Sequence, residues 1–268
     1  MASTFSILLT EHQGDISRII INRTEDRNSI NSELMVELDQ ALTEAESGPA
    51  RAVIFSGAGG SHFIGGADGI EMMQCNPEQA GSFSERIQGL FNRMEASPLI
   101  LLAAINGLCF GGGYEFALAC DFRIAGETAR IGLPEVKVGL IPGGGGTQRL
   151  THLVGYGRAL EMILSGKLYK AEEALSMGLI HKVVPDIDLP AEAGRFLEPV
   201  LKNPDYAIRQ AKRAIRLGLG RSLPEGLGIE TAEFQKCFHQ SFFRDLMRRQ
   251  IKTGQLTTTS PLPDWVDK

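Results

Sequence analysis

The sequence has few cysteines and no cluster of metal-binding side chains. Its four cysteines, Cys75, Cys109, Cys120 and Cys237, are too few for a disulfide scaffold in 268 residues, and no two of them have the spacing of a metal site. The five histidines are scattered, and no HExxH motif is present. We therefore expect reduced thiols in a cytoplasmic protein, and neither a structural nor a catalytic metal ion.

Long apolar runs and a strong charge of either sign are also missing. The longest strongly apolar run, Leu99–Ile105, is far shorter than the ~20 residues that span a bilayer. Residues 1–15 lack the apolar core of a secretory signal, and the last three residues match no peroxisomal or lipidation signal. The net charge of −5 is mild and argues against a large nucleic-acid surface. We expect no membrane partner and no nucleic-acid partner.

The composition is typical of a soluble globular protein, with 43% hydrophobic and 22% charged residues. The first half alternates strand, loop and helix, which predicts an α/β fold. The first predicted strand begins at Ile16. Strands are predicted at residues 16–21, 52–56, 99–105 and 122–125, and helices at 31–46, 77–96, 113–120 and 147–154.

The last quarter of the chain is predicted to be helical. Strand signals vanish from about Ala191. Ser222 and Glu225 have capping-box spacing, with Pro224 in the first turn, and they predict a long helix that runs toward Phe238. We therefore expect a core over residues 1–190 and a helical subdomain over residues 191–268.

Two glycine-rich loops each follow a buried strand. The first is Phe63–Asp68, and the second, Asn106–Glu115, places its glycines at a helix N-terminus. Free amides and the helix dipole favour negative charge there, which is the requirement of an oxyanion hole. The alternative is that both loops are plain structural turns. The second loop is no dinucleotide fingerprint, and Gly143–Gly146 is no phosphate loop because no Gly-Lys-Ser/Thr follows.

Two glutamates stand in apolar surroundings near these loops. Glu115 falls in the first turn of the helix after the second loop, and Glu135 follows Pro134 just before another glycine-rich segment. A carboxylate is costly to bury without a partner, and paired carboxylates divide acid and base work. The alternative is that each glutamate caps a helix or pairs with an arginine. The arginines near in sequence are Arg123, Arg130 and Arg149.

Four local patterns together resemble the crotonase superfamily, and within it the enoyl-CoA hydratases, from Ile16 to about Pro185. The patterns are Asn22-Arg23 with Asn28-Ser29-Ile30-Asn31, then Gly66-Ala67-Asp68, then Asn106-Gly107 with Gly111-Gly112-Gly113 and Cys120-Asp121, and finally Pro134-Glu135 with Gly139–Gly143. The resemblance implies an α/β, crotonase-like spiral of ββα turns followed by a C-terminal helical trimerisation region. It also implies a homotrimer or a homohexamer.

The resemblance assigns roles to individual residues. The amides of Ala67 and Gly112 would hold the thioester oxygen of an enoyl-CoA. Glu115 and Glu135 would flank one water molecule, with Glu135 as the main acid/base and Glu115 holding the water. The coenzyme A path, formed largely by backbone, would include Asn28, Ser29, Gly65, Asp68, Gly69, Ile70 and Gly143. Coenzyme A is then part of the substrate, and no separate cofactor is expected.

The same resemblance leaves some alternatives open. Both acidic positions hold glutamate, which favours hydration, whereas double-bond isomerases often keep only the equivalent of Glu135. Glu71 stands where hydratases commonly carry a lysine, and the segment 243–254 lacks the family's usual pattern, with Lys252 as a candidate substitute. The width of the acyl pocket depends on packing, so fatty acid, amino acid and aromatic breakdown all remain open.

One helical stripe of basic residues resembles RNA-binding relatives within the family. It consists of Arg209, Lys212, Arg213 and Arg216, at helical spacing. A solvated helix face, or one that meets coenzyme A phosphates, is the alternative that the acidic balance favours. Cys109, beside the glycines, is interpreted as a buried filler because no histidine is placed to activate it.

Overall fold

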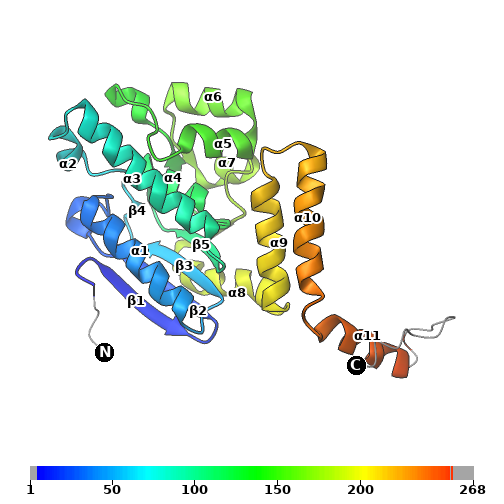
Figure 1. Ribbon diagram of the computed structural model, residues 1–268. Helices are drawn as coiled ribbons and strands as arrows, with labels where there is room; N and C mark the ends of the chain where they lie inside the picture. The colour runs from blue at the N-terminus through cyan, green and yellow to red at the C-terminus, as the bar shows by residue number, and fades with distance from the viewer. Residues whose placement is uncertain (1–4, 254, 256–268) are drawn as a thin grey trace. The chain divides into compact units, whose positions relative to one another are not determined.

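The chain forms two compact units, Met1–Lys202 and Asn203–Lys268 (Figure 1). The computed structural model describes residues 5–253 and residue 255. The boundary lies after helix α8 (Leu189–Leu201), rather than after residue 190 as expected. The reason is that α8 buries Leu189, Ala193 and Leu197 at helical spacing and packs on the main sheet of the first unit.

The main sheet of the first unit has six strands, and all of its pairs except the first are parallel. In spatial order they are β1 (Leu8–Gln13), β2 (Ile16–Ile21), β3 (Ala52–Gly57), β5 (Ile100–Ile105), β7 (Phe122–Gly126) and β10 (Lys182–Val184). The first strand is therefore β1, and the expectation that the strands begin at Ile16 is wrong. In β1 only Leu8 is buried, so this edge strand carries no alternating apolar signal.

A second, smaller sheet has four short strands. They are β4 (His62–Ile64), β6 (Leu108–Phe110), β8 (Arg130–Gly132) and β9 (Tyr169–Lys170), with β4, β6 and β8 parallel to one another. The sequence predicts β4 and β6 as loop, because strands of three residues are too short to show periodicity. Successive turns of the chain give one strand to each sheet, which is the ββα spiral that the resemblance implies.

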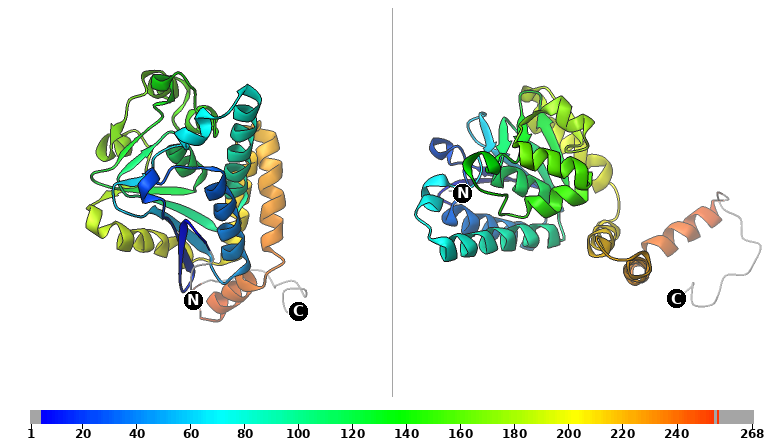
Figure 2. Two further views of the ribbon diagram at one scale, coloured as in Figure 1. Left: turned by 90° about the vertical axis from the view of Figure 1, so that its left-hand side faces the viewer. Right: turned by 90° about the horizontal axis from the view of Figure 1, so that it is seen from above.

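Helices α1 (Ser32–Ser47) and α3 (Pro77–Ala96) lie side by side on one face of the main sheet, and α8 lies on the other (Figures 1 and 2). Both begin where predicted, because Asn31 caps α1 and Asn76 forms a capping box with Gln79 at the start of α3. The remaining helices of this unit are α2 (Gly69–Met73), α4 (Gly112–Ala119), α5 (Gly146–Val154), α6 (Tyr156–Ser165) and α7 (Ala171–Ser176).

Helix α4 runs through the core, and all of its residues are buried. The ring of Phe116 meets the rings of Phe55, Phe63 and Phe91 edge-on, at centroid distances of 5.0, 6.0 and 5.8 Å. Such contacts hold a helix in one rotation about its axis. The direction of its neighbour Glu115 is thereby determined by the packing of the core.

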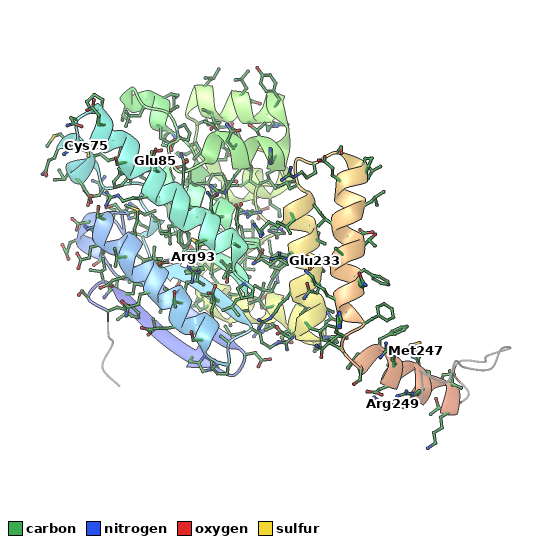
Figure 3. All side chains as sticks on the ribbon, in the orientation of Figure 1. Cys75, Glu85, Arg93, Glu233, Met247 and Arg249 are labelled. Carbon is green, nitrogen blue, oxygen red and sulfur yellow. The ribbon has the colours of Figure 1, made fainter. Side chains whose placement is uncertain are left out.

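The second unit contains helices α9 (Asp205–Gly218), α10 (Leu223–Cys237) and α11 (Phe242–Lys252), with α9 packed on α10. The predicted capping box of Ser222 and Glu225 is present at the start of α10. Glu233 of α10 accepts hydrogen bonds from Arg213 at 3.0 Å and Lys236 at 2.7 Å (Figure 3). Across the described part of the chain, no helix is both long enough and apolar enough to cross a membrane.

Candidate active site

Three neighbouring strands of the smaller sheet end at the same edge, where the candidate site residues lie. Strands β4, β6 and β8 are parallel, so their carboxyl ends lie at the same edge of the sheet. Ala67 comes three residues after β4, Gly112 two residues after β6, and Glu135 three residues after β8. Ligands of α/β proteins bind at this edge, and the topology therefore brings together residues that are far apart in the sequence.

The amides of Ala67 and Gly112 converge at this edge. Ile30 donates to the carbonyl of Gly66 at 2.8 Å and accepts from Asp68 at 2.8 Å, so the amide of Ala67 faces the opposite side of its strand. Gly112 is the first residue of α4, where amides have no partner within the helix. A methyl group added to Gly112 would lie only 3.1 Å from the amide nitrogen of Ala67. Both donors thus face one small space.

Glycine is required just before each of these amides. Gly66 has φ +99° and Gly111 has φ +55°, a region that other residues rarely adopt. These two backbone conformations turn the chain so that the next amide points toward the site. The role of this pair as an oxyanion hole, which the glycine pattern predicts, stays a prediction.

Glu115 is held by the glycine-rich loop before α5. Its side chain is buried, with only 2% of the residue exposed, and its Oε1 accepts hydrogen bonds from the amides of Gly144 at 2.8 Å and Gly146 at 2.7 Å. Burial raises the pKa of Glu115, while the two amides and the charge of Arg149 partly offset the rise. Gly146 is the first residue of α5, so Glu115 also caps this helix. The helix-capping role that the sequence left open as an alternative is therefore present.

Glu135 stands at the start of a short 3-10 helix, Glu135–Val138. Both of its carboxylate oxygens are buried, and neither has a hydrogen-bond partner among the described residues. Burial raises the pKa of Glu135 to about 7, with a further contribution from the charge of Glu115. Oε1 would lie 3.5 Å from a methyl group placed on Gly111, beside the two converging amides. The site thus contains a carboxyl group that exchanges protons near neutral pH.

Asn28 and Ser29, two residues of the expected coenzyme A path, form hydrogen bonds that hold neighbouring loops together. Asn28 has φ +55°, accepts from the amide of Arg23 at 2.9 Å and donates to the carbonyls of Ala58 at 3.1 Å and His62 at 2.9 Å. Its buried side chain therefore joins three segments. Arg23 donates at 2.5 Å to the carbonyl of Ser29.

The first glycine-rich loop and Gly143 contain the other expected contacts. Asp68 accepts at 3.1 Å from Arg23 and also caps α2, while Ile70 is exposed and Gly69 has open space around its Cα. The amide of Gly65 donates to the carbonyl of Arg27 at 2.9 Å, and the carbonyl of Gly143 accepts two hydrogen bonds from α3. A coenzyme A contact at each of these positions stays a prediction.

The structure also shows what replaces the lysine that is common in hydratases. Glu71 accepts a hydrogen bond from the amide of Ser32 at 2.8 Å and another from the Ser32 hydroxyl. Ser32 is the first residue of α1, so Glu71 caps a helix. The sequence offers no signal for this contact, because the two residues belong to separate helices that only the fold brings together.

Two other candidates from the sequence have structural partners. In the basic stripe of α9, Arg209 pairs with Asp205 at 2.7 Å and Arg213 pairs with Glu233 at 3.0 Å, so the stripe is partly neutralised within its own unit. Cys109 is buried, and burial raises the pKa of its thiol well above the ordinary value, which disfavours a nucleophile.

No group of three or more His, Cys, Asp or Glu side chains within residues 5–253 and 255 is arranged to hold a metal ion. The expectation that no metal ion and no separate cofactor take part stays a prediction.

The sequence and fold are similar to those of known proteins. The chain is 37% identical to the short-chain-enoyl-CoA hydratase of Clostridium acetobutylicum over 93% of its own length and 96% of the relative. It is 34% identical to the crotonyl-CoA hydratase of Syntrophomonas wolfei, over 86% of this chain and 89% of the relative. The solved structure of an enoyl-CoA hydratase from Bacillus anthracis superposes with a TM-score of 0.86 at 36% identity, covering 95% of this chain and 98% of that one.

The fold is therefore the crotonase fold that the sequence patterns predict. The family model for enoyl-CoA hydratase/isomerase matches residues 11–255, which is nearly the whole chain. The chain belongs to the enoyl-CoA hydratase/isomerase family.

Proposed function

We propose that this protein is an enoyl-CoA hydratase, a hydro-lyase that adds water across the α,β double bond of an enoyl-CoA thioester and forms a 3-hydroxyacyl-CoA. The observation that carries the proposal is the pair of buried glutamates beside two converging amides. Glu115 is held by the amides of Gly144 and Gly146, whereas the oxygens of Glu135 have no protein partner among the described residues. An isolated acid/base would not need a second carboxylate that is so firmly placed.

The two amides provide the electrostatic part of the reaction. The thioester oxygen accepts hydrogen bonds from the amides of Ala67 and Gly112, and these bonds strengthen as the substrate becomes enolate-like. The dipole of α4 begins at Gly112 and favours the same negative charge. Stabilisation is therefore largest at the point where charge develops.

The two glutamates divide the proton transfers. Glu115 holds the water through Oε2, since Oε1 is occupied by the glycine amides, and accepts a proton as the water oxygen bonds to the β-carbon. Glu135, with a pKa of about 7, donates a proton to the α-carbon. Glu115 thus gains one proton from water, and Glu135 loses one to the α-carbon. A proton transfer from Glu115 to Glu135 then restores the ionised Glu115 and the protonated Glu135. The product carries the hydroxyl on the β-carbon and the new hydrogen on the α-carbon.

The assembly is proposed to be a homotrimer or homohexamer built through the second unit. Phe234 and Phe238 of α10 and Phe243 of α11 stack edge-on at 5.2 and 5.7 Å while remaining partly exposed. Exposed aromatic clusters of this kind are typical of protein interfaces. We also propose a cytoplasmic enzyme, because the chain has few cysteines and its longest apolar run is short.

The test is to mix the purified protein with crotonyl-CoA and follow the absorbance of the conjugated thioester. Hydration removes the conjugation, so the absorbance falls, and the product is identified as 3-hydroxybutyryl-CoA by mass spectrometry. A protein that binds the thioester without consuming it would contradict hydration of this substrate. Longer, branched and aromatic enoyl groups are compared in the same assay, because the acyl group sets the pathway.

Double-bond isomerisation is a second candidate, favoured by one observation. Isomerisation needs one group that moves a proton between two carbons of the same acyl chain. Glu135 is sufficient for this step, because its pKa is about 7 and its oxygens have no partner among the described residues. Activity on a 3-enoyl-CoA that survives Glu115→Ala would support isomerisation. Loss of that activity in the same variant would reject it.

A further inference from the structure

We propose that Arg149 is a positioning residue for this reaction, which holds the glycine loop Gly144–Gly146 and through it the carboxylate of Glu115. The inference rests on the proposed function for its kinetic consequences, while the positioning itself is a property of the loop. Arg149 does not reach Glu115 by a direct hydrogen bond that the structure records. It acts through the backbone that binds Glu115.

The guanidinium of Arg149 joins two elements at once. Nη1 donates to the carbonyl of Gly144 at 2.8 Å. Nε donates to Oε1 of Glu95 at 2.9 Å, and Nη2 donates to Oε2 of Glu95 at 3.2 Å and to Oδ1 of Asn92 at 2.6 Å. Glu95 and Asn92 belong to α3, and only 12% of the arginine side chain is exposed. The bidentate pair anchors the guanidinium on α3, so its hydrogen bond to the loop has a defined direction.

Both backbone polar groups of Gly144 form hydrogen bonds. Its carbonyl accepts from Arg149, and its amide donates to Oε1 of Glu115 at 2.8 Å. The next residue, Gly145, has φ +106°, and a methyl group there would lie 2.2 Å from Nη1 of Arg149. The arginine therefore occupies the space left by the missing side chain of Gly145. A shift of Arg149 would change the peptide that binds the catalytic carboxylate.

Helix α3 contacts the preceding residue of the same loop as well. The carbonyl of Gly143 accepts from Ser84 at 2.7 Å and from Gln88 at 2.7 Å. Together with Asn92 and Glu95, these residues form a polar stripe on α3 at helical spacing. Arg149 links the C-terminal part of this stripe to the loop, in addition to the contacts at Gly143 and the hydrogen bonds of the loop amides to Glu115.

The charge of Arg149 has a second effect at Glu115. Three groups favour the ionised carboxylate there, namely the amides of Gly146 and Gly144 and the charge of Arg149, while burial opposes it. Glu135 is the other titratable group described at the site, and the charge of Glu115 helps to raise its pKa. Because Glu115 must be ionised to accept a proton from water, loss of the arginine charge should move the acid limb of the rate profile to higher pH.

The experiment compares Arg149→Met, Arg149→Lys and the control Arg93→Met. Arg93 lies on α3 itself (Figure 3), and it forms ion pairs with two residues of α1, at 2.7 Å with Asp39 and 2.9 Å with Glu46. The control therefore removes an arginine network that also involves α3, at a more exposed position, without touching the glycine loop. The assays are kcat and KM for crotonyl-CoA across pH, thermal stability, and hydrogen exchange of peptides that contain residues 143–146.

Arg149→Met is expected to lower kcat by about 10- to 100-fold, because small displacements of a catalytic group have effects of this size. KM should stay within about twofold, since thioester binding is not altered. The acid limb should move to higher pH, and exchange in residues 143–146 should become faster. Arg149→Lys keeps the positive charge but loses the two-pronged set of guanidinium donors. Its acid limb should therefore lie at the wild-type pH, while its kcat should lie between those of Arg149→Met and the wild type. Arg93→Met should keep kcat.

Two results would overturn the proposal. One is an Arg149→Met protein whose kcat, acid limb and exchange at residues 143–146 all match the wild type. The other is an equal loss of kcat in Arg149→Met and Arg93→Met, which would mean general destabilisation. If Arg149→Met does not fold, Glu95→Gln removes the anchor of the guanidinium and is judged by the same measures. A wild-type protein without hydratase activity would reject the proposed function, and hydrogen exchange would still decide the positioning role.

Discussion

Glu115 and Glu135 face the same site with opposite hydrogen-bond environments. Oε1 of Glu115 accepts two amide hydrogen bonds, at 2.8 and 2.7 Å, while neither oxygen of Glu135 has a partner within the described part of the chain. The charge of Glu115 also helps to raise the pKa of Glu135. Two residues of the same type therefore receive different proton affinities from their surroundings, which is how a pair of carboxyl groups acquires separate acid and base roles.

Glu135→Gln is expected to lower kcat for hydration by about 100- to 10,000-fold, because it removes the group that donates a proton to the α-carbon. The amides of Ala67 and Gly112 are unchanged, so binding of a saturated acyl-CoA should stay close to that of the wild type. Stopped-flow absorbance measures the first quantity and isothermal titration calorimetry the second. Loss of binding together with a lower melting temperature would show instead that Glu135 has a structural role.

The same variant should be more stable than the wild type at alkaline pH. The folded pKa of Glu135 is about 7, against an ordinary value of 4.5, so the folded state binds more protons than the unfolded state between these values. Wild-type stability should therefore fall as the pH rises from about 4.5 to 7, by about 1–3 kcal/mol from this group. Glutamine is neutral throughout and avoids this loss. Melting temperatures of both proteins at pH 5 and pH 8 check the sign, and an equal difference at both would contradict it.

Gly112→Ala should impair the reaction more than the fold. The added methyl group would lie 3.1 Å from the amide nitrogen of Ala67, in the space proposed for the thioester oxygen. We expect kcat to fall by about 100- to 1,000-fold, the usual effect of losing one oxyanion-hole donor. Gly89→Ala is the matched control, because no atom lies within 4 Å of its added methyl group on α3. The control should keep full activity and gain about 0.5–1 kcal/mol of stability, and an equally active Gly112→Ala would argue against this oxyanion hole.

Phe234→Asp should dissociate the proposed homotrimer or homohexamer. Phe234 is 63% exposed and stacks on Phe238, so a charge there would disrupt an interface but would remove little core packing. Light scattering after size-exclusion chromatography should show a smaller mass for this variant than for the wild type. Glu230→Ala, which changes another exposed residue of α10, is the control and should keep the wild-type mass. An unchanged mass in Phe234→Asp would place the subunit contacts elsewhere.

Local sequence signals closely located the two long helices α1 and α3 and four of the six strands of the main sheet, β2, β3, β5 and β7. The helix predicted at 77–96 matches α3 at both ends, because a capping box begins it and Ser97-Pro98 ends it. The strand predicted at 16–21 also matches β2, whose isoleucine-rich sequence is a strong signal. Helices α2, α6 and α7 were not predicted. Among the strands, the missed ones are β1, an exposed edge strand, the short strands β4 and β6, which lie inside segments predicted as glycine-rich loops, and the short strands β8, β9 and β10. Such short or half-exposed strands are specified by their partners rather than by their own pattern.

The sequence by itself determined the α/β class, through the alternation of strand and helix signals, and the family and the identity of the candidate residues, through the local spacing of glycines and glutamates. Only the tertiary structure decided what surrounds each residue. Three parallel strands bring Ala67, Gly112 and Glu135 to one edge, and a loop tied to α3 by Arg149 supplies the two amides that bind Glu115. Hydrogen-bond partners and pKa values depend on contacts between residues distant in the chain, and these contacts exist only once the fold has formed.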